Sequence, residues 1–254
     1  MDIQIFWVQV RDLTMASIKS RYRKTWAGFI WVVLSPLLMF GVQSLVFNKF
    51  LKLNIPDYYL FLLGGLLTWI FFSTTVQMGT PVFVSQSQLL RSFKVNPLVI
   101  LSSQVLDNFI NFLASFILIL IPFYIFEGKS LIPLTLIPLA LIPLLLGTFA
   151  LTVALGLSNV FFRDTSFVIG FVFSLLFFLT PIFYPREYVP AEWQWLTDIN
   201  PVTYLIDPFR VVIHDPNVDV FIPSILKSCG VALIITAVSV LFWKRKQNDF
   251  YRKL

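Results

Sequence analysis

Residue types that could perform catalysis are sparse in this chain of 254 residues. The sequence has one histidine, His214, and one cysteine, Cys229, so a multi-histidine metal site and an internal disulfide cannot be assembled. It contains neither H-E-x-x-H nor the G-x-x-x-x-G-K-[S/T] motif that binds ATP phosphates. A Ser-His-Asp arrangement would have only His214 as its base. We therefore expect a protein that is not an enzyme, with no metal or cofactor of its own.

One carboxylate lies where a functional role must be considered. Asp107, followed by Asn108 and Asn111, is the only acidic residue inside a long apolar stretch. A charged side chain is costly in hydrocarbon, so an intramembrane carboxylate is a functional hypothesis by default. Two interpretations remain open: a proton relay, and a structural role in which the carboxylate is hydrogen-bonded between helices. The sequence offers no basic partner nearby, which favours the structural role.

The composition is that of a membrane protein. Hydrophobic residues make up 57% of the chain and charged residues 13%, against about 25% charged residues in soluble domains. The mean hydropathy is +0.83. The net charge of +6 does not indicate nucleic-acid binding, because five Lys and Arg lie in residues 1–28 and five in residues 244–254. Two basic ends on a hydrophobic body indicate topology.

The apolar segments predict an all-α integral membrane protein with six transmembrane helices. Crossing a hydrocarbon core of ~30 Å takes about 20 helical residues. Lys and Arg are concentrated at both ends, whereas the 186–219 loop has two of them and six acidic residues, which places both termini in the cytoplasm. The predicted spans are 29–50, 58–84, 98–126, 131–162, 165–184 and 220–243.

Residues 1–25 are expected to form an amphipathic helix on the cytoplasmic surface. Ile3, Phe6, Val10 and Leu13 recur at helical spacing, and charged residues fall on the opposite side. The alternative is an ordinary solvated leader.

The 185–219 segment differs in kind from the spans. Seven prolines lie between Pro181 and Pro223, and the apolar stretch 204–213 is too short to cross a membrane. We expect a re-entrant hairpin that enters from the outer face and borders a pathway, because non-helical backbone at that depth needs protein or a water-filled cavity around it. The alternative is a cap packed on the outer leaflet.

Several motifs follow one another over nearly the whole chain: Arg11-Asp-Leu, Arg21-Tyr-Arg, the Gly28–Pro36 segment, Leu89-Leu-Arg-Ser-Phe-Lys-Val-Asn-Pro97, Phe162-Arg-Asp164, and Asn200-Pro201 with Arg210. In this order they resemble the membrane subunits of ABC-2 type transporters. The resemblance is strongest to the branch that exports polysaccharides, O-antigen above all.

The resemblance implies a channel-forming subunit in the cytoplasmic (inner) membrane that exports polyprenyl-linked polysaccharide as a homodimer. Two separate ATP-binding cassette subunits would bind ATP and Mg and contact a coupling helix at 87–96. In that helix we expect an aromatic anchor with flanking cations to make the contact; the alternative is that these cations only anchor the loop at the headgroups. The residues are Arg91, Phe93 and Lys94.

The resemblance also implies that the hairpin after the fifth span acts as a gate on the outer side of the membrane. Its candidate residues are Asn200, Pro201 and Arg210. Two alternatives remain open for the whole chain. One is an ABC-2 permease for a small lipid or drug, and the other is a proton-coupled secondary transporter that uses Asp107.

Aromatic side chains suit a path for sugars, because the C–H faces of pyranose rings lie against aromatic rings without fixed hydrogen bonds that each step must break. Aromatic residues make up 17% of the chain. Any one of them can instead face lipid or the protein core. The candidates for the path are Trp31, Phe40, Phe47, Phe171, Phe178, Tyr184, Trp193 and Trp195.

Overall fold

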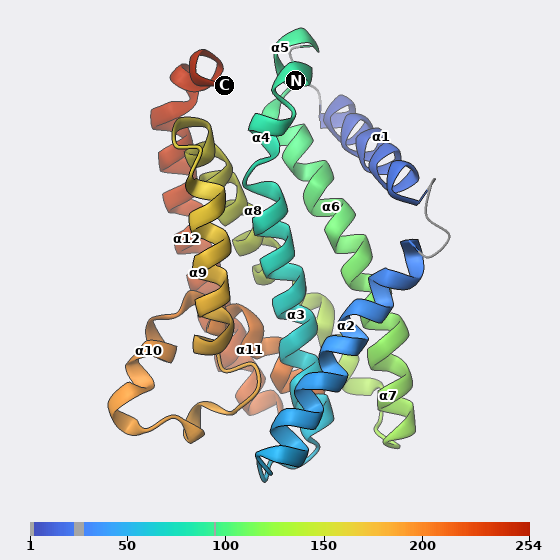
Figure 1. The fold of residues 1–254 in the computed structure, drawn as a ribbon. Coiled ribbons are helices and arrows are strands. Elements are labelled where there is room, and N and C mark those ends of the chain that lie inside the picture. The colour runs from blue at the N-terminus through green and yellow to red at the C-terminus, as the bar shows by residue number, and fades with distance from the viewer. Residues whose placement is uncertain (1–2, 23–27, 94) are drawn as a thin grey trace.

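The computed structural model describes residues 3–22, 28–93 and 95–254, and in this part the regular secondary structure is helical, without strands (Figure 1). Lys94, one of the expected coupling residues, lies outside the described residues.

Five helical stretches among the described residues are long and apolar enough to cross a membrane. Their lengths follow from the uninterrupted apolar runs in the sequence, because a helix satisfies all of its own backbone hydrogen bonds. They are α2 (Gly28–Ser44) with a π-helical turn at Leu45–Phe50, α3 (Tyr58–Gly79), α6 (Pro97–Ser115) continued through Phe116–Leu120 into α7 (Ile121–Phe126), α8 (Ile137–Phe161) preceded by a 3-10 turn at Ile132–Leu136, and α12 (Val218–Lys253).

The remaining apolar helix, α9 (Thr165–Leu179), has 15 residues and is shorter than the expected span 165–184. At 1.5 Å per residue it is roughly 22 Å long. The helix ends because Pro181 disfavours the helical conformation of the residue before it. Thr180 accordingly has an extended backbone, with φ −84° and ψ 129°.

The last helix, α12, is longer than the expected span 220–243, because the basic triplet at 244–246 does not end it. One side of its final turns packs against the protein. Phe250 is 1% exposed and its ring lies edge-on to that of Phe83, with the centroids 5.3 Å apart. Leu254 is 4% exposed in the same apolar cluster.

Helix α1 (Ile3–Tyr22) lies against α6 at one end of the bundle (Figure 1). Its position on a membrane surface stays a prediction. The short helices α4 (Val82–Ser85) and α5 (Ser87–Phe93) lie at the same end, where α12 also finishes.

The opposite end of the bundle holds the segment after α9. It contains 3-10 turns at Arg186–Tyr188 and Ala191–Trp193, then α10 (Gln194–Ile199) and α11 (Pro201–His214) (Figure 1). Helix α11 returns into the bundle and packs against α3, α8 and α12. Its apolar side chains Leu205, Ile206 and Phe209 are fully buried.

Helix α3 is at the centre of the protein. It packs against α2, α6, α8, α9 and α11, and 83% of its apolar window is buried. Because most of its side chains are apolar and buried, the other helices pack around α3.

Candidate functional site

The segment after α9, Thr180–Tyr184, leaves the helical conformation inside the protein. Ile182 and Phe183 are fully buried. Buried backbone outside a helix must find hydrogen-bond partners elsewhere. The Tyr58 hydroxyl of α3 supplies one by donating to the Phe183 carbonyl at 3.1 Å.

Arg210 of α11 supplies a second partner, because its guanidinium donates to the carbonyl oxygen of Pro181. The residue is 9% exposed. Its guanidinium carbon lies 4.7 Å from the centroid of the Phe61 ring, and Nη1 lies 3.9 Å from Oδ1 of Asp207. A buried cation therefore holds the end of α9 to α11 and α3, with a ring face and a carboxylate offsetting its charge.

Asn200 joins the same cluster from the start of α11. Its Nδ2 donates to Thr180 Oγ1 at 2.8 Å, and its Oδ1 accepts from the Val202 amide at 3.0 Å as the N-cap of the helix. Pro201 follows at the first helical position, where a missing N–H costs nothing. The gate residues expected from the sequence thus include two, Asn200 and Arg210, that fix the end of α9.

Two adjacent glycines of α3 allow this cluster to come close. A Cβ on Gly64 would lie 3.4 Å from Cα of Arg210, and one on Gly65 would lie 3.3 Å from the carbonyl oxygen of Ile182. Helix α11 and the segment after α9 therefore pack directly on the α3 backbone.

The loop between this cluster and α10 is held by an exposed ion pair. Both Nε and Nη2 of Arg186 donate to the Asp198 carboxylate, each at 2.7 Å. These hydrogen bonds, together with the positive charge, hold the pKa of Asp198 below its usual range.

The aromatic candidates of the first span lie in three different environments. Trp31 is 55% exposed, at the beginning of α2. Phe40 is 5% exposed and packs edge-on against Phe123, with the centroids 5.2 Å apart. Phe47 stacks on Phe183 at 4.9 Å, which ties the end of the first span to the segment after α9.

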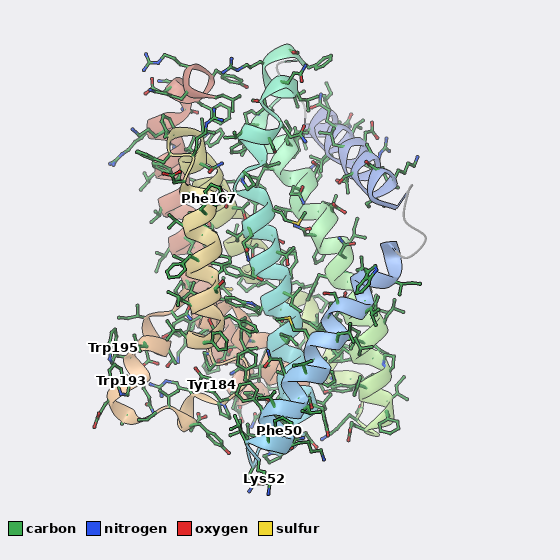
Figure 2. All side chains as sticks on the ribbon, viewed as in Figure 1. Phe50, Lys52, Phe167, Tyr184, Trp193 and Trp195 are labelled. Atoms are coloured by element: carbon green, nitrogen blue, oxygen red, sulfur yellow. The ribbon has the colours of Figure 1, made fainter. Side chains whose placement is uncertain are left out.

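The candidates from α9 onward are mostly exposed in the single chain. Phe171 and Phe178 are 67% and 64% exposed. The Tyr184 hydroxyl donates to the Phe178 carbonyl at 2.6 Å. Figure 2 shows Trp193 and Trp195 at the outer edge of the loop, with Tyr184 closer to the bundle.

At the other end of the molecule, α5 presents two of the three expected coupling residues. Arg91 is exposed and Phe93 is 74% exposed, whereas Leu90 on the same short helix is fully buried. The buried leucine fixes the helix on the apolar cluster beneath it, and the phenylalanine projects from it.

Asp107 lies in a contact between α1 and α6. It is fully buried, and its Oδ2 accepts a hydrogen bond from the Ser17 hydroxyl at 3.2 Å. One turn away, the Thr14 hydroxyl donates to the carbonyl of Ser103 at 3.3 Å. The carboxylate is thus hydrogen-bonded between helices, as in the structural interpretation of its role.

Sequence reasoning missed Tyr58 and Ser115. Tyr58 holds the Phe183 carbonyl, and Ser115 donates to the carbonyl of Val32 at 2.9 Å. A hydroxyl inside an apolar run is the available clue, but the run does not show which carbonyl the hydroxyl will meet.

Helices of this length, composition and number define a multi-pass membrane protein. The sequence profile described as "ABC-2 type transporter" matches residues 8–214, and the chain belongs to that family. Its members are transport components without a catalytic domain, carry no cofactor themselves and work with ATP-binding subunits. Family membership therefore confirms the expectation of a transport subunit rather than an enzyme.

Curated relatives extend over most of the chain. It is 29% identical to the O-antigen export system permease protein RfbA of Myxococcus xanthus, over 93% of this chain and 92% of that protein. It is 26% identical to the O-antigen export system permease protein RfbA of Klebsiella pneumoniae, over 90% and 88%. The polysialic acid transport protein KpsM of Escherichia coli is 23% identical, over 80% of each chain.

Proposed function

We propose that this chain is the channel-forming permease subunit of an ATP-driven exporter that moves lipid-linked polysaccharide of the O-antigen kind across the cytoplasmic membrane. The observation that carries the proposal is similarity over nine-tenths of the chain to relatives named as O-antigen export permeases. Two copies would pair, and two ATP-binding subunits would drive them.

In this proposal α9 and the segment after it together form the fifth of six spans. Helix α9 alone is short of the ~30 Å hydrocarbon core, and the proposal counts Thr180–Tyr184 as the rest of the span. The hydrogen bonds from Arg210 and Tyr58 support this assignment, because they satisfy the non-helical backbone at depth. Six spans would put both termini on the cytoplasmic side, together with α1 and α5, and the gate hairpin 185–219 outside.

In this proposal the coupling helix is the segment of the chain that contacts the ATP-binding subunit. Phe93 is exposed on a helix fixed by Leu90, an arrangement that suits insertion of one aromatic anchor into a groove of a partner. Arg91 lies beside it as a cation.

The pathway would lie where two copies bring α2 and α9 together. Phe167, Phe171 and Phe178 follow one another at helical spacing on α9 and are 79%, 67% and 64% exposed in the single chain. Trp31 adds an exposed ring on α2. A polymer of sugars sliding past such rings meets weak and similar contacts at every unit.

Deleting the gene tests the proposal. We expect full-length lipid-linked glycan to accumulate on the cytoplasmic side, detected by glycolipid gel after fractionation, and a plasmid copy to reverse the accumulation. An unchanged glycan profile would reject polysaccharide as the cargo and favour an ABC-2 permease for a small lipid or drug.

A further inference from the structure

A cavity of about 200 Å³ lies between α2, α3 and α6. Its lining comes mainly from the first turns of α2 and from the second halves of α3 and α6. Its polar lining is formed by Ser35, Thr74, Asn108, Asn111 and Ser115, and its apolar lining includes Trp31 and Phe71.

Asn108 indicates that this cavity takes a polar ligand. The side chain lines the cavity and is 5% exposed, and its amide Nδ2 has no hydrogen-bond partner in the part of the chain that the structure describes. An unpaired buried donor costs free energy, of the order of the hydrogen bond that it lacks. A ligand that accepts from Nδ2 would recover that free energy.

The remaining lining restricts the ligand to an uncharged group. None of the described residues around the cavity is acidic or basic, so a carboxylate or phosphate would be buried without a counter-charge. Hydroxyl and amide groups together with aromatic rings match a sugar ring, which has hydroxyls at its edge and C–H groups on its faces. The volume lies below the ~300–1,000 Å³ of pockets for drug-sized ligands, which suits a single ring.

We infer that the cavity binds one neutral sugar ring of the lipid-linked glycan before transport, with Asn108 as a hydrogen-bond donor to a sugar hydroxyl and Trp31 as the ring at its mouth. The inference rests on the proposed function and adds to it a site on each copy and a preference for neutral over acidic sugars.

Thiol protection in the assembled transporter measures occupancy of this cavity. Ser35 is exposed and lines the cavity, so Ser35→Cys in a Cys229→Ala chain leaves one thiol at the site. The complex with its ATP-binding subunits, in lipid nanodiscs, is treated with a membrane-permeant maleimide. The probes are polyprenyl-phosphate glucose, polyprenyl-phosphate glucuronic acid and bare polyprenyl phosphate.

We expect the glucosyl lipid to slow alkylation at position 35, and the other two lipids to leave the rate unchanged. Val42→Cys, on an exposed part of α2 outside the cavity lining, is the control and should react equally with every probe. Equal protection by the bare lipid, equal protection by the glucuronosyl lipid, or no protection would each overturn the inference.

Asn108→Leu removes the amide at similar volume and should raise the half-protecting concentration of the glucosyl lipid roughly threefold to tenfold, the value of one neutral hydrogen bond. Asn159→Leu is the matched control, because Asn159 is 3% exposed, its Oδ1 has no hydrogen-bond partner among the described residues, and it lies on α8, outside the cavity. An equal effect of the two substitutions would reject the role of Asn108. If Asn108→Leu does not fold, Trp31→Leu at the exposed mouth is tested in its place, and unchanged protection would count against the site.

The two proposals fail separately. Glycan accumulation in the deletion strain without sugar protection at position 35 rejects the cavity alone. An unchanged glycan profile in that strain rejects the cargo.

Discussion

The Ser115 hydroxyl of α6 donates a 2.9 Å hydrogen bond to the carbonyl oxygen of Val32 in α2. In a regular helix that carbonyl would accept from the amide of residue 36. Residue 36 is Pro36, which has no N–H to give. A serine from a neighbouring helix thus satisfies the carbonyl that proline leaves unpaired, and it joins α2 to α6 at the wall of the cavity.

This relationship predicts coupling between two substitutions. Ser115→Ala should destabilise the detergent-solubilised protein by about 1–3 kcal/mol, because the Val32 carbonyl loses its partner. In a Pro36→Ala chain the helix can satisfy that carbonyl, so the cost of Ser115→Ala should fall. Thermal unfolding of the four proteins forms a double-mutant cycle, and equal costs in both backgrounds would contradict the account.

Arg210 should matter for stability more than an exposed arginine of the same loop region. Arg210→Met leaves the buried Pro181 carbonyl without its donor, at a cost of about 1–3 kcal/mol. Arg186→Met breaks only an exposed ion pair and serves as the control. Thermal stability measured by size-exclusion chromatography after heating compares them. If Arg210→Met lowers thermal stability no more than Arg186→Met does, the hydrogen bond to Pro181 does not stabilise the fold.

The end of α3 approaches α8 too closely for a side chain. A Cβ on Gly79 would lie 2.2 Å from Cγ2 of Thr152. Gly79→Ala should therefore destabilise the protein by about 1–3 kcal/mol. Thr152→Ser removes Cγ2 but keeps the hydroxyl that donates to Thr148, and should restore most of the loss. Gly230→Ala is the control, because an added Cβ there would meet no described residue within 4 Å apart from its own helix backbone. Unfolding measurements in which Thr152→Ser fails to restore stability would argue against the clash.

The exposed ring on α5 should transmit ATP hydrolysis to transport. Phe93→Ala should abolish export while leaving assembly and ATP hydrolysis by the partner subunits intact, since the substitution removes only an exposed anchor. Phe126→Ala is the matched control, because Phe126 is 85% exposed at the other end of the bundle. Export and ATP hydrolysis are measured in the same membranes, and normal export by Phe93→Ala would exclude this residue as the anchor.

The Arg186–Asp198 pair should make the outer loop sensitive to acid. The pKa of Asp198 is lowered in the folded protein by its hydrogen bonds to Arg186. The stabilisation is therefore present above the unfolded pKa, about 3.9, and is lost as the pH falls through the lower folded value. Protease cleavage within residues 185–200 should rise as the pH falls below about 4, whereas Asp198→Asn should show no such change. A parallel rise in the variant would exclude the pair as the cause.

Much of the helical layout could be predicted because it depends on local properties. An uninterrupted apolar run favours a helix, and its length sets the length of the helix, as in α2 and α6. The short α9 could not be predicted from apolarity alone. Its end depends on Pro181 and on distant donors, Arg210 and Tyr58, that make a non-helical segment tolerable at depth.

The candidate site was harder to predict from the sequence. In a membrane protein, apolar residues occupy both the buried core and the exposed surface, so residue type alone does not separate the two. Phe40 and Phe171 are both phenylalanines of apolar spans, yet the first lies in the core and the second is exposed. Their roles along a pathway stay predictions. The contact of Asp107 with Ser17 depends on how α1 docks on α6, which no local pattern encodes.

Transport in inverted membrane vesicles tests the central claim most directly. Vesicles that contain this permease and its ATP-binding partner are loaded on their outer face with lipid-linked glycan, and glycan that becomes inaccessible to added glycosidase is measured. The account predicts that sequestration requires ATP and the partner and is unaffected by a protonophore. Sequestration driven by a proton gradient without ATP, or no movement of glycan with ATP present, would contradict it.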